Sequence, residues 1–449
     1  MIVRFFLALA SAVLVSSGPL LAAEEAAPKE EESTPNFSES TLTGDWGGAR
    51  TAAWKRGLAW EAGLKADVLQ NRGGTTRGNQ AMSHLELKFR ADFEKLFGWS
   101  NAVAFVNIND DRGAGLNARR TGSLMGVSNI EVPVPTARLF HAWVQKGFFD
   151  DRFSILAGIY PIDSEFFTID SAATLLHPAY GTPGDLALTR GPSVFNNAAF
   201  GVRTKWFSSD RTLYAMGALM DGIPNDPARP KATAVRFAKG DGGFFIAELG
   251  WMPLEQGHAF ETTDPTAMRL PEDVTRHEQY EGISKYALGL WGYGSRVADL
   301  VDVDANGAAL QRHSRGGYLL AERTLWNIGS EGGRNLTAFG RYSFADSDTI
   351  SIDRTINLGM RILGPFASRP RDIVAVGWTR ARLASKWRTQ QAASGTDTVT
   401  AEDALEISWR AALTRWLAIQ PNYQRIRHPG GTAAAPTATV VGARIEVTF

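Results

Sequence analysis

The feature that most constrains this 449-residue chain is an alternation of apolar and polar side chains that recurs along its length. The last ten residues read VVGARIEVTF, and apolar side chains from Val441 to Phe449 occupy every second position. Successive side chains of a β-strand point to opposite faces, so this pattern predicts a strand with two different faces. The chain stops on an aromatic residue within that strand, whereas soluble domains usually end in a few loose residues.

The same alternation is found in residues 83–93, 198–207, 242–253, 335–344, 355–364 and 404–413. One face of these segments is uniformly apolar, and the other carries full charges in mid-segment. Aromatic residues collect near the predicted strand ends, namely Trp206, Trp251, Tyr342, Phe344, Trp416 and Phe449. Aromatic girdles with this placement mark membrane interfaces, and a sheet that spans lipid must close on itself. We therefore predict an all-β fold, a transmembrane antiparallel β-barrel, with a soluble secreted β-protein as the alternative.

The N-terminus has the pattern of a secretory signal peptide. Arg4 precedes an apolar run over 5–15, and small residues follow at Ala22 and Ala23. This run is shorter than the ~20 residues of a spanning helix, which disfavours a membrane anchor. We expect a signal peptide over 1–23, a flexible lead-in over 24–41, which is acidic and poor in aromatics, and one barrel domain over 42–449.

Composition excludes several classes of function. Lys+Arg and Asp+Glu are both 47, so the net charge is zero and a nucleic-acid partner is not expected. The chain has no cysteine, which excludes disulfides, thiolate metal sites and a cysteine nucleophile. Outside the N-terminus no run of 18 apolar residues occurs. The mature protein is therefore expected to be exported, without a helical membrane span.

Motifs of catalysis and cofactor binding are missing from the sequence. The G-x-S-x-G, P-loop, H-E-x-x-H and G-x-G-x-x-G patterns are absent, and the seven histidines are scattered singly. We expect no cofactor, and a barrel enzyme remains only a distant alternative. Residues 302–313 place Asp302, Asp304 and Asn306 at positions 1, 3 and 5 of a calcium loop, but His313 replaces the glutamate at position 12. An ordinary polar hairpin loop is therefore favoured over a weak calcium site.

A short N-terminal helix is expected over 46–55. Asp45 can cap its first turn and Gly57 can end it, with Trp46 and Trp54 packed on the barrel. This helix would either narrow the periplasmic mouth or act as a structural plug with no effect on selectivity, and we favour the second role.

Several segments in order resemble the carbohydrate-selective porins of the OprB type. They are LTGDWGGAR (42–50), RGLAWEAGLKADVLQN (56–71), GIYPIDSEFF (158–167), GPSVFNNAAFGVRTKW (191–206), IAELGW (246–251), GPFASRPRD (364–372) and ALEISWRAALTRWLAIQPNYQRIRHPGG (404–431). The resemblance implies a sixteen-stranded barrel that passes sugars, and barrels of 16–18 strands enclose an aqueous channel. Residues 171–190 depart from the family pattern, because they are long and poor in aromatics. The resemblance also implies that assembly machinery reads the terminal Phe449.

We therefore expect a porin for facilitated diffusion of carbohydrates in the outer membrane of a Gram-negative bacterium, and not an enzyme. An anion-preferring or general diffusion porin is the alternative. The expected partners are sugars, outer-membrane lipid and the barrel-assembly machinery, and self-association is left open. Alternation assigns twelve charged residues to the lumen as candidates for sugar binding, eight cations and four anions: Glu86, Lys88, Arg90, Arg203, Lys205, Glu248, Arg341, Arg361, Glu406, Arg410, Arg444 and Glu446.

Overall fold

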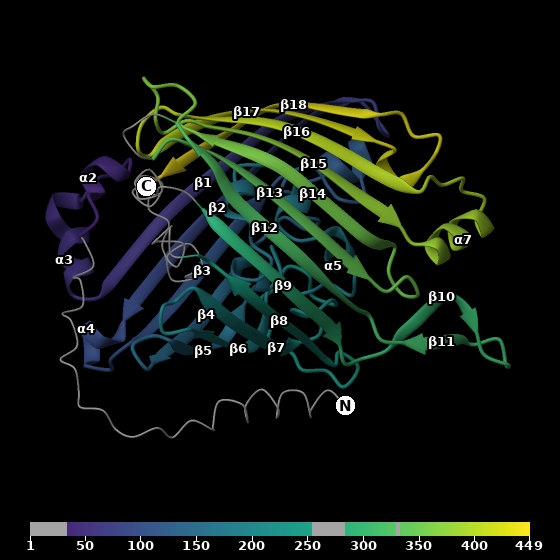
Figure 1. The fold of residues 1–449 in the computed structure, drawn as a ribbon, viewed down its shortest axis with the longest axis horizontal. Helices are drawn as coiled ribbons and strands as arrows, with labels where there is room; N and C mark the ends of the chain where they lie inside the picture. Colours follow the sequence, from purple (N-terminus) through teal and green to yellow (C-terminus); the bar gives the residue numbers. More distant parts are fainter. Residues whose placement is uncertain (1–33, 254–282, 329–332) are drawn as a thin grey trace. The chain divides into compact units, whose positions relative to one another are not determined.

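The computed structural model describes residues 34–253, 283–328 and 333–449. The expected signal peptide over 1–23 lies outside these residues. Residues Pro35–Phe449 form one unit, in which sixteen strands close into an antiparallel barrel (Figure 1). In chain order the barrel strands are β1 (Leu58–Arg72), β2 (Gly78–Asp92), β3 (Ala102–Arg112), β4 (Ala137–Phe148), β5 (Phe153–Tyr160), β6 (Ala199–Phe207), β7 (Leu213–Asp221), β8 (Gly243–Trp251), β9 (Ser284–Tyr293), β12 (Arg315–Asn327), β13 (Asn335–Ala345), β14 (Ile352–Leu363), β15 (Ile373–Leu383), β16 (Ala401–Ala412), β17 (Leu417–Arg427) and β18 (Ala438–Thr448).

Closure of the sheet confirms the predicted barrel of about sixteen strands. Each barrel strand pairs with the next one along the chain, and β18 pairs with β1 through ten residues on each strand. No barrel strand among the described residues is left with an unpaired edge, which is the condition for a sheet to lie in lipid. No helix in the described ranges combines the length and the apolar character needed to cross a membrane.

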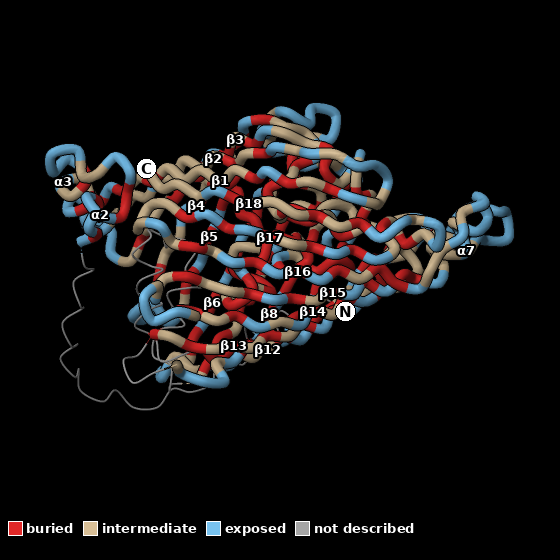
Figure 2. The backbone as a smooth tube through the Cα atoms, turned by 90° about the horizontal axis from the view of Figure 1, so that it is seen from above, coloured by how far each residue is buried: buried red, intermediate tan, exposed pale blue. Residues whose placement is uncertain are grey.

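Buried and exposed residues alternate along the strands and separate two faces of the wall (Figure 2). In β6, Phe200, Val202 and Trp206 are about 40% exposed, whereas Arg203 and Lys205 between them are buried. The same division holds along β8, β13 and β16, whose exposed large side chains are apolar. The exposed apolar face is the outer surface that lipid covers, and the charged face is directed toward the lumen.

The two ends of the barrel differ in the length of their connections. At the end where the chain terminates, strands are joined by short turns such as 149–152, 208–212 and 413–416. The β8–β9 connection also belongs to this end, but its residues 254–282 are not described. Much longer connections leave the opposite end, including 113–136, 161–198, 222–242 and 384–400. We call these the terminal end and the loop end.

Residues at the start of the unit Pro35–Phe449 pack against the terminal end. The lead-in expected to reach residue 41 already forms α2 (Phe37–Ser40), and Phe37 is buried against the ring of Trp54. The expected helix over 46–55 is interrupted, because positive φ angles at Gly47 and Gly48 separate η1 (Trp46–Gly48) from α3 (Ala49–Lys55). Asp45 accepts a hydrogen bond from the N–H of Thr51 at 2.8 Å, one turn beyond the expected capping position.

The two tryptophans of this region differ in environment. Trp54 is buried, and the guanidinium of Arg90 lies 5.7 Å from its ring centroid. Trp46 is 53% exposed, and its ring centroid lies 5.6 Å from that of Trp60. Both tryptophans therefore contact barrel strands as expected, and only Trp54 is enclosed.

The calcium-loop lookalike is a hairpin of β10 (Val297–Val303) and β11 (Ala309–Arg312) beyond the barrel. Asp302 lies 2.7 Å from the ammonium of Lys386 in α7 (Ser385–Ala393), and Asp304 accepts the N–H groups of Asn306 and Ala308. These carboxylates serve ion pairs and a turn, as the hairpin interpretation requires. Within the described ranges no group of three or more acidic or histidine side chains is arranged to hold a metal. A further short α-helix, α4 (Phe93–Phe97), lies between strands at the terminal end.

Candidate functional site

Two long connections from the loop end fold back into the barrel (Figure 1). Inner segment 1 comprises residues 113–136 and contains η2 (Asn117–Thr121). Inner segment 2 comprises residues 161–198 and contains η3 (Ile162–Ser164), η4 (Asp170–Ala172), η5 (Pro178–Tyr180) and α5 (Gly184–Ala187). Both segments hydrogen-bond to lumen-facing side chains of strands from widely separated parts of the barrel. The segments therefore occupy the lumen, and they narrow a channel that sixteen strands alone would leave wide.

Buried glutamates of the wall accept hydrogen bonds from the backbone of the inner segments. Short irregular segments have N–H groups without ladder partners, and a carboxylate that accepts two of them satisfies both donors inside the barrel. The pairs are Glu248 with Phe167 N at 2.8 Å, Glu322 with Ser171 N at 2.9 Å, Glu406 with Leu176 N at 2.6 Å and His177 N at 2.9 Å, and Glu402 with Leu124 N at 2.9 Å.

Arg341 on β13 holds inner segment 2 through the opposite kind of bond. Its guanidinium donates to the carbonyl oxygens of Phe167 at 2.9 Å, Ala179 at 2.5 Å and Gly181 at 2.6 Å. It also donates to the side-chain oxygen of Asn357, and it is only 1% exposed. One fully buried cation thus joins three points of the segment that are up to fourteen residues apart.

Arg203 and Lys205 are neutralised by a carboxylate of inner segment 2. Glu165 lies 2.8 Å from the Arg203 guanidinium and 3.1 Å from the Lys205 ammonium. Burial alone would raise the pKa of the Glu165 carboxyl, but these two cations outweigh it and hold the pKa below its usual range. This pair of cations therefore does not form an open cationic patch.

Arg444 on β18 connects the wall with inner segment 1. It forms a two-point ion pair with Asp67 on β1, at 2.7 and 3.0 Å, and donates to the side-chain oxygen of Asn129 at 2.7 Å. Asp67 also accepts the hydroxyl hydrogen of Ser128 at 2.7 Å. Segment 1 is therefore fixed where β18 meets β1.

A group of charges lines the lumen next to the Asp67–Arg444 ion pair, on the side of the terminal end. We call the set Arg410, Glu446, Lys65, Glu86, Lys88 and Glu61 the charged arc. Arg410 and Glu446 lie 2.7 Å apart, and Lys88 lies 3.0 Å from Glu86 and 3.2 Å from Glu61. Lys65 is the register partner of Glu446, two residues from the pair Asp67 and Arg444, which corresponds to about 7 Å along the strand.

Exposure distinguishes the arc from the residues that hold the segments. The side chains of Arg410, Glu446, Glu86 and Lys88 are 17–22% exposed, whereas those of Arg203 and Glu165 are at most 1% exposed. Glu61 is a buried member of the arc, beneath the partly exposed Lys88 that it pairs with. Cations and anions alternate in the arc, with three of each. Its side chains therefore offer both donors and acceptors to a solute in the channel.

The twelve sequence-predicted residues all lie in barrel strands, on the face opposite the exposed apolar side chains. Six of them contact the inner segments, namely Arg203, Lys205, Glu248, Arg341, Glu406 and Arg444. Four belong to the charged arc: Glu86, Lys88, Arg410 and Glu446. Arg90 lies over Trp54, and Arg361 donates to Asn335 at 3.3 Å.

Sequence reasoning missed most of the compensating carboxylates. Glu61 and Asp67 lie on the inward face of β1, opposite Leu64 and Val68, as does the cation Lys65, so the same alternation applied to residues 58–72 would have found all three. Glu322 and Glu402 lie on the inward faces of β12 and β16 and show the same signal. Glu165 lies in a connection, where no strand periodicity marks it. These anions offset the eight-to-four excess of cations counted from the sequence.

Comparisons with known proteins agree with this architecture. The family model described as "Carbohydrate-selective porin, OprB family" matches residues 77–449, well over half of the chain. Porin B from Pseudomonas aeruginosa is 23% identical over 458 residues, which cover 94% of each chain. The protein described as "Putative porin QuiX" from Acinetobacter baylyi is 21% identical and covers 91% of this chain and 93% of its own length.

A solved structure shares the fold. The high-pH structure of Pseudomonas putida OprB superposes with a TM-score of 0.78 at 20% identity, and the match covers 93% of this chain and all of that chain. Together with the closed barrel and the narrowed, charged lumen, the family match shows that this chain belongs to the carbohydrate-selective porin family of the OprB type, a channel for carbohydrates in the Gram-negative outer membrane rather than an enzyme.

Proposed function

We propose that sugars cross this porin beside the two inner segments and are bound and selected at the charged arc. The observation that supports this role is the alternation of three cations with three anions on β16, β18, β1 and β2, of which all but Glu61 are partly exposed. The buried charges that hold the inner segments have a different role, because their polar atoms are already used in those contacts.

The alternation suits a neutral polyhydroxylated solute. Each sugar hydroxyl both donates and accepts hydrogen bonds, so neighbouring hydroxyls can meet a carboxylate and a cation in turn. A sugar that enters the arc exchanges part of its hydration for these groups. A millimolar site corresponds to about 4 kcal/mol, which two or three hydrogen bonds to charged groups supply. Such weak binding selects sugars and still releases them.

An anion-preferring channel would need a net positive lumen at the point of closest contact. In the arc the charges are balanced, since Arg410, Lys65 and Lys88 face Glu446, Glu86 and Glu61. Within a Debye length of about 8 Å at physiological salt, an ion therefore meets both signs. This balance supports carbohydrates over inorganic or organic anions as the selected solutes.

The test is to remove one charge of each sign together. In Arg410→Gln/Glu446→Gln both side chains keep hydrogen-bonding groups, and the net charge does not change. We expect a neutral sugar to block single-channel current several-fold more weakly, while the reversal potential in a salt gradient stays constant. The matched control is Arg112→Gln/Asp110→Asn, which removes an ion pair of 2.8 Å from the outer wall of β3.

Unchanged sugar block in the lumen variant would show that the arc is not the selective site. A shift of the reversal potential without any change in sugar block would instead favour an ion-selective channel.

A further inference from the structure

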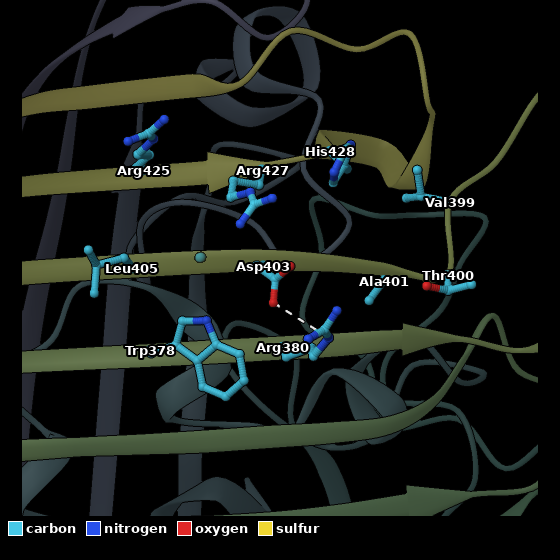
Figure 3. Close-up of a pocket in the computed structure, with 11 residues that line it drawn as sticks. Trp378, Arg380, Val399, Thr400, Ala401, Asp403, Leu405, Arg425, Arg427 and His428 are labelled. Atoms are coloured by element: carbon cyan, nitrogen blue, oxygen red, sulfur yellow. Dashed lines mark ion pairs between the residues drawn. The ribbon is translucent and has the colours of Figure 1, made fainter.

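A cavity on the outer wall of the barrel combines arginines with apolar side chains. It has a volume of about 640 Å³ and lies over β15, β16 and β17 at the loop end (Figure 3). Three arginines, Arg380, Arg425 and Arg427, line it together with Asp403, Trp378 and Leu405. This end faces the exterior, because outer-membrane porins place short turns in the periplasm and longer loops outside.

Strand register places these arginines in rows across the wall. Arg427, Asp403 and Arg380 are neighbours in one row on β17, β16 and β15. Arg425, Leu405 and Trp378 form the next row toward the membrane centre. The row of charge is thus followed, toward the membrane centre, by a row that contains Trp378 and Leu405, and we call these two side chains the apolar floor of the cavity.

The arginines point outward rather than into the lumen. Arg380 and Arg382 alternate along β15 with the buried Thr379 and Ala381, and each has 47% of its side chain exposed. They share a face with Val376, which is 40% exposed. The outward face is therefore not apolar at this end of β14–β17, where the arginines lie outside the segments in which the sequence has a uniformly apolar face.

Charge at this site is not balanced within the protein. Arg380 pairs with Asp403 at 3.6 Å and Arg382 with Asp353 at 3.3 Å. Within the described part of the chain, no carboxylate lies within ion-pairing distance of Arg425, Arg427 or the outward Arg354 on β14. Five arginines thus face two carboxylates.

Two of these arginines are also placed against each other. Arg354 and Arg382 are direct cross-strand partners, and the Asp353 carboxylate that pairs with Arg382 offsets only one of the two positive charges. A site that concentrates guanidinium groups in this way is suited to phosphate, which arginine binds with two parallel hydrogen bonds.

We propose that this cavity binds the phosphorylated headgroup of an outer-leaflet lipid. Arg380, Arg382, Arg425 and Arg427 contact its phosphates, and Trp378 and Leu405 contact the first part of its acyl chains. The arginines lie on the lipid-facing wall at the exterior end, immediately above the apolar surface formed by Leu358, Val376 and Ile407. A lipid presents both a phosphate and a chain to this wall, whereas a soluble anion would leave the apolar floor unused.

The experiment measures binding of diphosphoryl lipid A to the purified barrel in detergent by native mass spectrometry. The variant Arg425→Gln/Arg427→Gln removes two arginines that have no carboxylate partner among the described residues, so the loss of the barrel fold is not expected. We expect the apparent affinity of this variant for diphosphoryl lipid A to fall about tenfold. The affinity of Arg380→Gln/Arg382→Gln/Arg425→Gln/Arg427→Gln should fall further. The matched control is Arg112→Gln. Arg112 is an outward arginine of β3 that also lies at the loop end, and it has its own carboxylate partner, Asp110. This variant should bind diphosphoryl lipid A as the wild type does.

Heat-modified mobility on gels and unchanged sugar block establish that each variant is folded. Equal affinity of the wild type, the double variant and the control would overturn the proposal. Full displacement of the lipid by 10 mM inorganic phosphate would also overturn it, because the site would then recognise a free anion. A loss of affinity confined to the cavity variants and resistant to inorganic phosphate is the expected result.

Discussion

Replacement of Arg341 by methionine should release inner segment 2 from the wall. Methionine is unbranched and apolar, shorter than arginine, and has no donor, so the carbonyl oxygens of Phe167, Ala179 and Gly181 lose their buried partner. Each buried polar group left without a partner costs about 1–3 kcal/mol, although water can enter and satisfy part of the set. We take the lower limit of about 3 kcal/mol in total, which shifts the equilibrium between the closed and released segment roughly 100-fold.

The absence of cysteine from the chain permits a direct measurement of this release. Ala172 is 2% exposed within inner segment 2, so Ala172→Cys introduces a single thiol that reagents reach only when the segment leaves its site. We expect the labelling rate to rise about 100-fold in Ala172→Cys/Arg341→Met relative to Ala172→Cys alone. Single-channel conductance should rise as well, because the segment occupies part of the lumen.

Arg112→Met is the control. Arg112 lies on the outer wall of β3 and pairs with Asp110 at 2.8 Å, so its replacement removes a guanidinium that does not face the segment. This variant should change neither the labelling of the thiol introduced by Ala172→Cys nor the conductance. If Arg341→Met behaved as Arg112→Met does in both measurements, the assignment of Arg341 as an anchor of the segment would be refuted.

Three further predictions concern other described residues. Asp185 lies outside the membrane-spanning strands, and burial raises its pKa to about 6, so the free energy of unfolding falls as pH rises from about 4 to 6. Asp185→Asn should therefore raise the thermal unfolding midpoint at pH 7.5, by up to ~3 kcal/mol in free energy, and have little effect near pH 4. An equal effect at both pH values would contradict this titration. Calcium chelation in an uncharged lipid bilayer should leave conductance unchanged, because Asp302 and Asp304 already have protein partners; a change that Asp302→Ala/Asp304→Ala abolishes would disprove this. Deletion of Phe449 should lower the amount of protein in the outer membrane more than it lowers refolding in detergent, and normal membrane levels would exclude the assembly role.

The sequence was sufficient for the fold and for the face on which the charges of the analysed strand segments lie. Period-two alternation is a local property, so Arg203 and Lys205 could be assigned to the lumen without knowledge of their neighbours. Barrel closure follows from physical necessity once strands face lipid, because unpaired backbone groups have no partner there.

Partners of these charges could not be predicted in the same way. Glu406 accepts the N–H groups of Leu176 and His177, which are some 230 positions away in the chain. Every residue except proline carries an N–H group, so no sequence pattern marks the ones that a carboxylate will accept. The distinction between anchoring charges and the charged arc therefore required the three-dimensional structure.

The outward arginines illustrate a different limit. Residues 374–382 alternate correctly, yet the outward face changes from Val376 and Trp378 to Arg380 and Arg382 near the end of β15. Alternation predicts which face of the wall a side chain lies on, but not how deep in the membrane it lies. Depth depends on strand register and tilt, which fix where the apolar band ends.

The central claim is that a charge-balanced arc selects neutral carbohydrates. The most direct measurement compares block of single-channel current by a neutral sugar and by its sugar acid of the same size, at equal concentration and physiological salt. The account predicts that the neutral sugar blocks at the lower concentration, and that Arg410→Gln/Glu446→Gln weakens this block more than block by the acid. Stronger block by the acid in the wild-type channel would contradict the account and favour an anion-preferring porin.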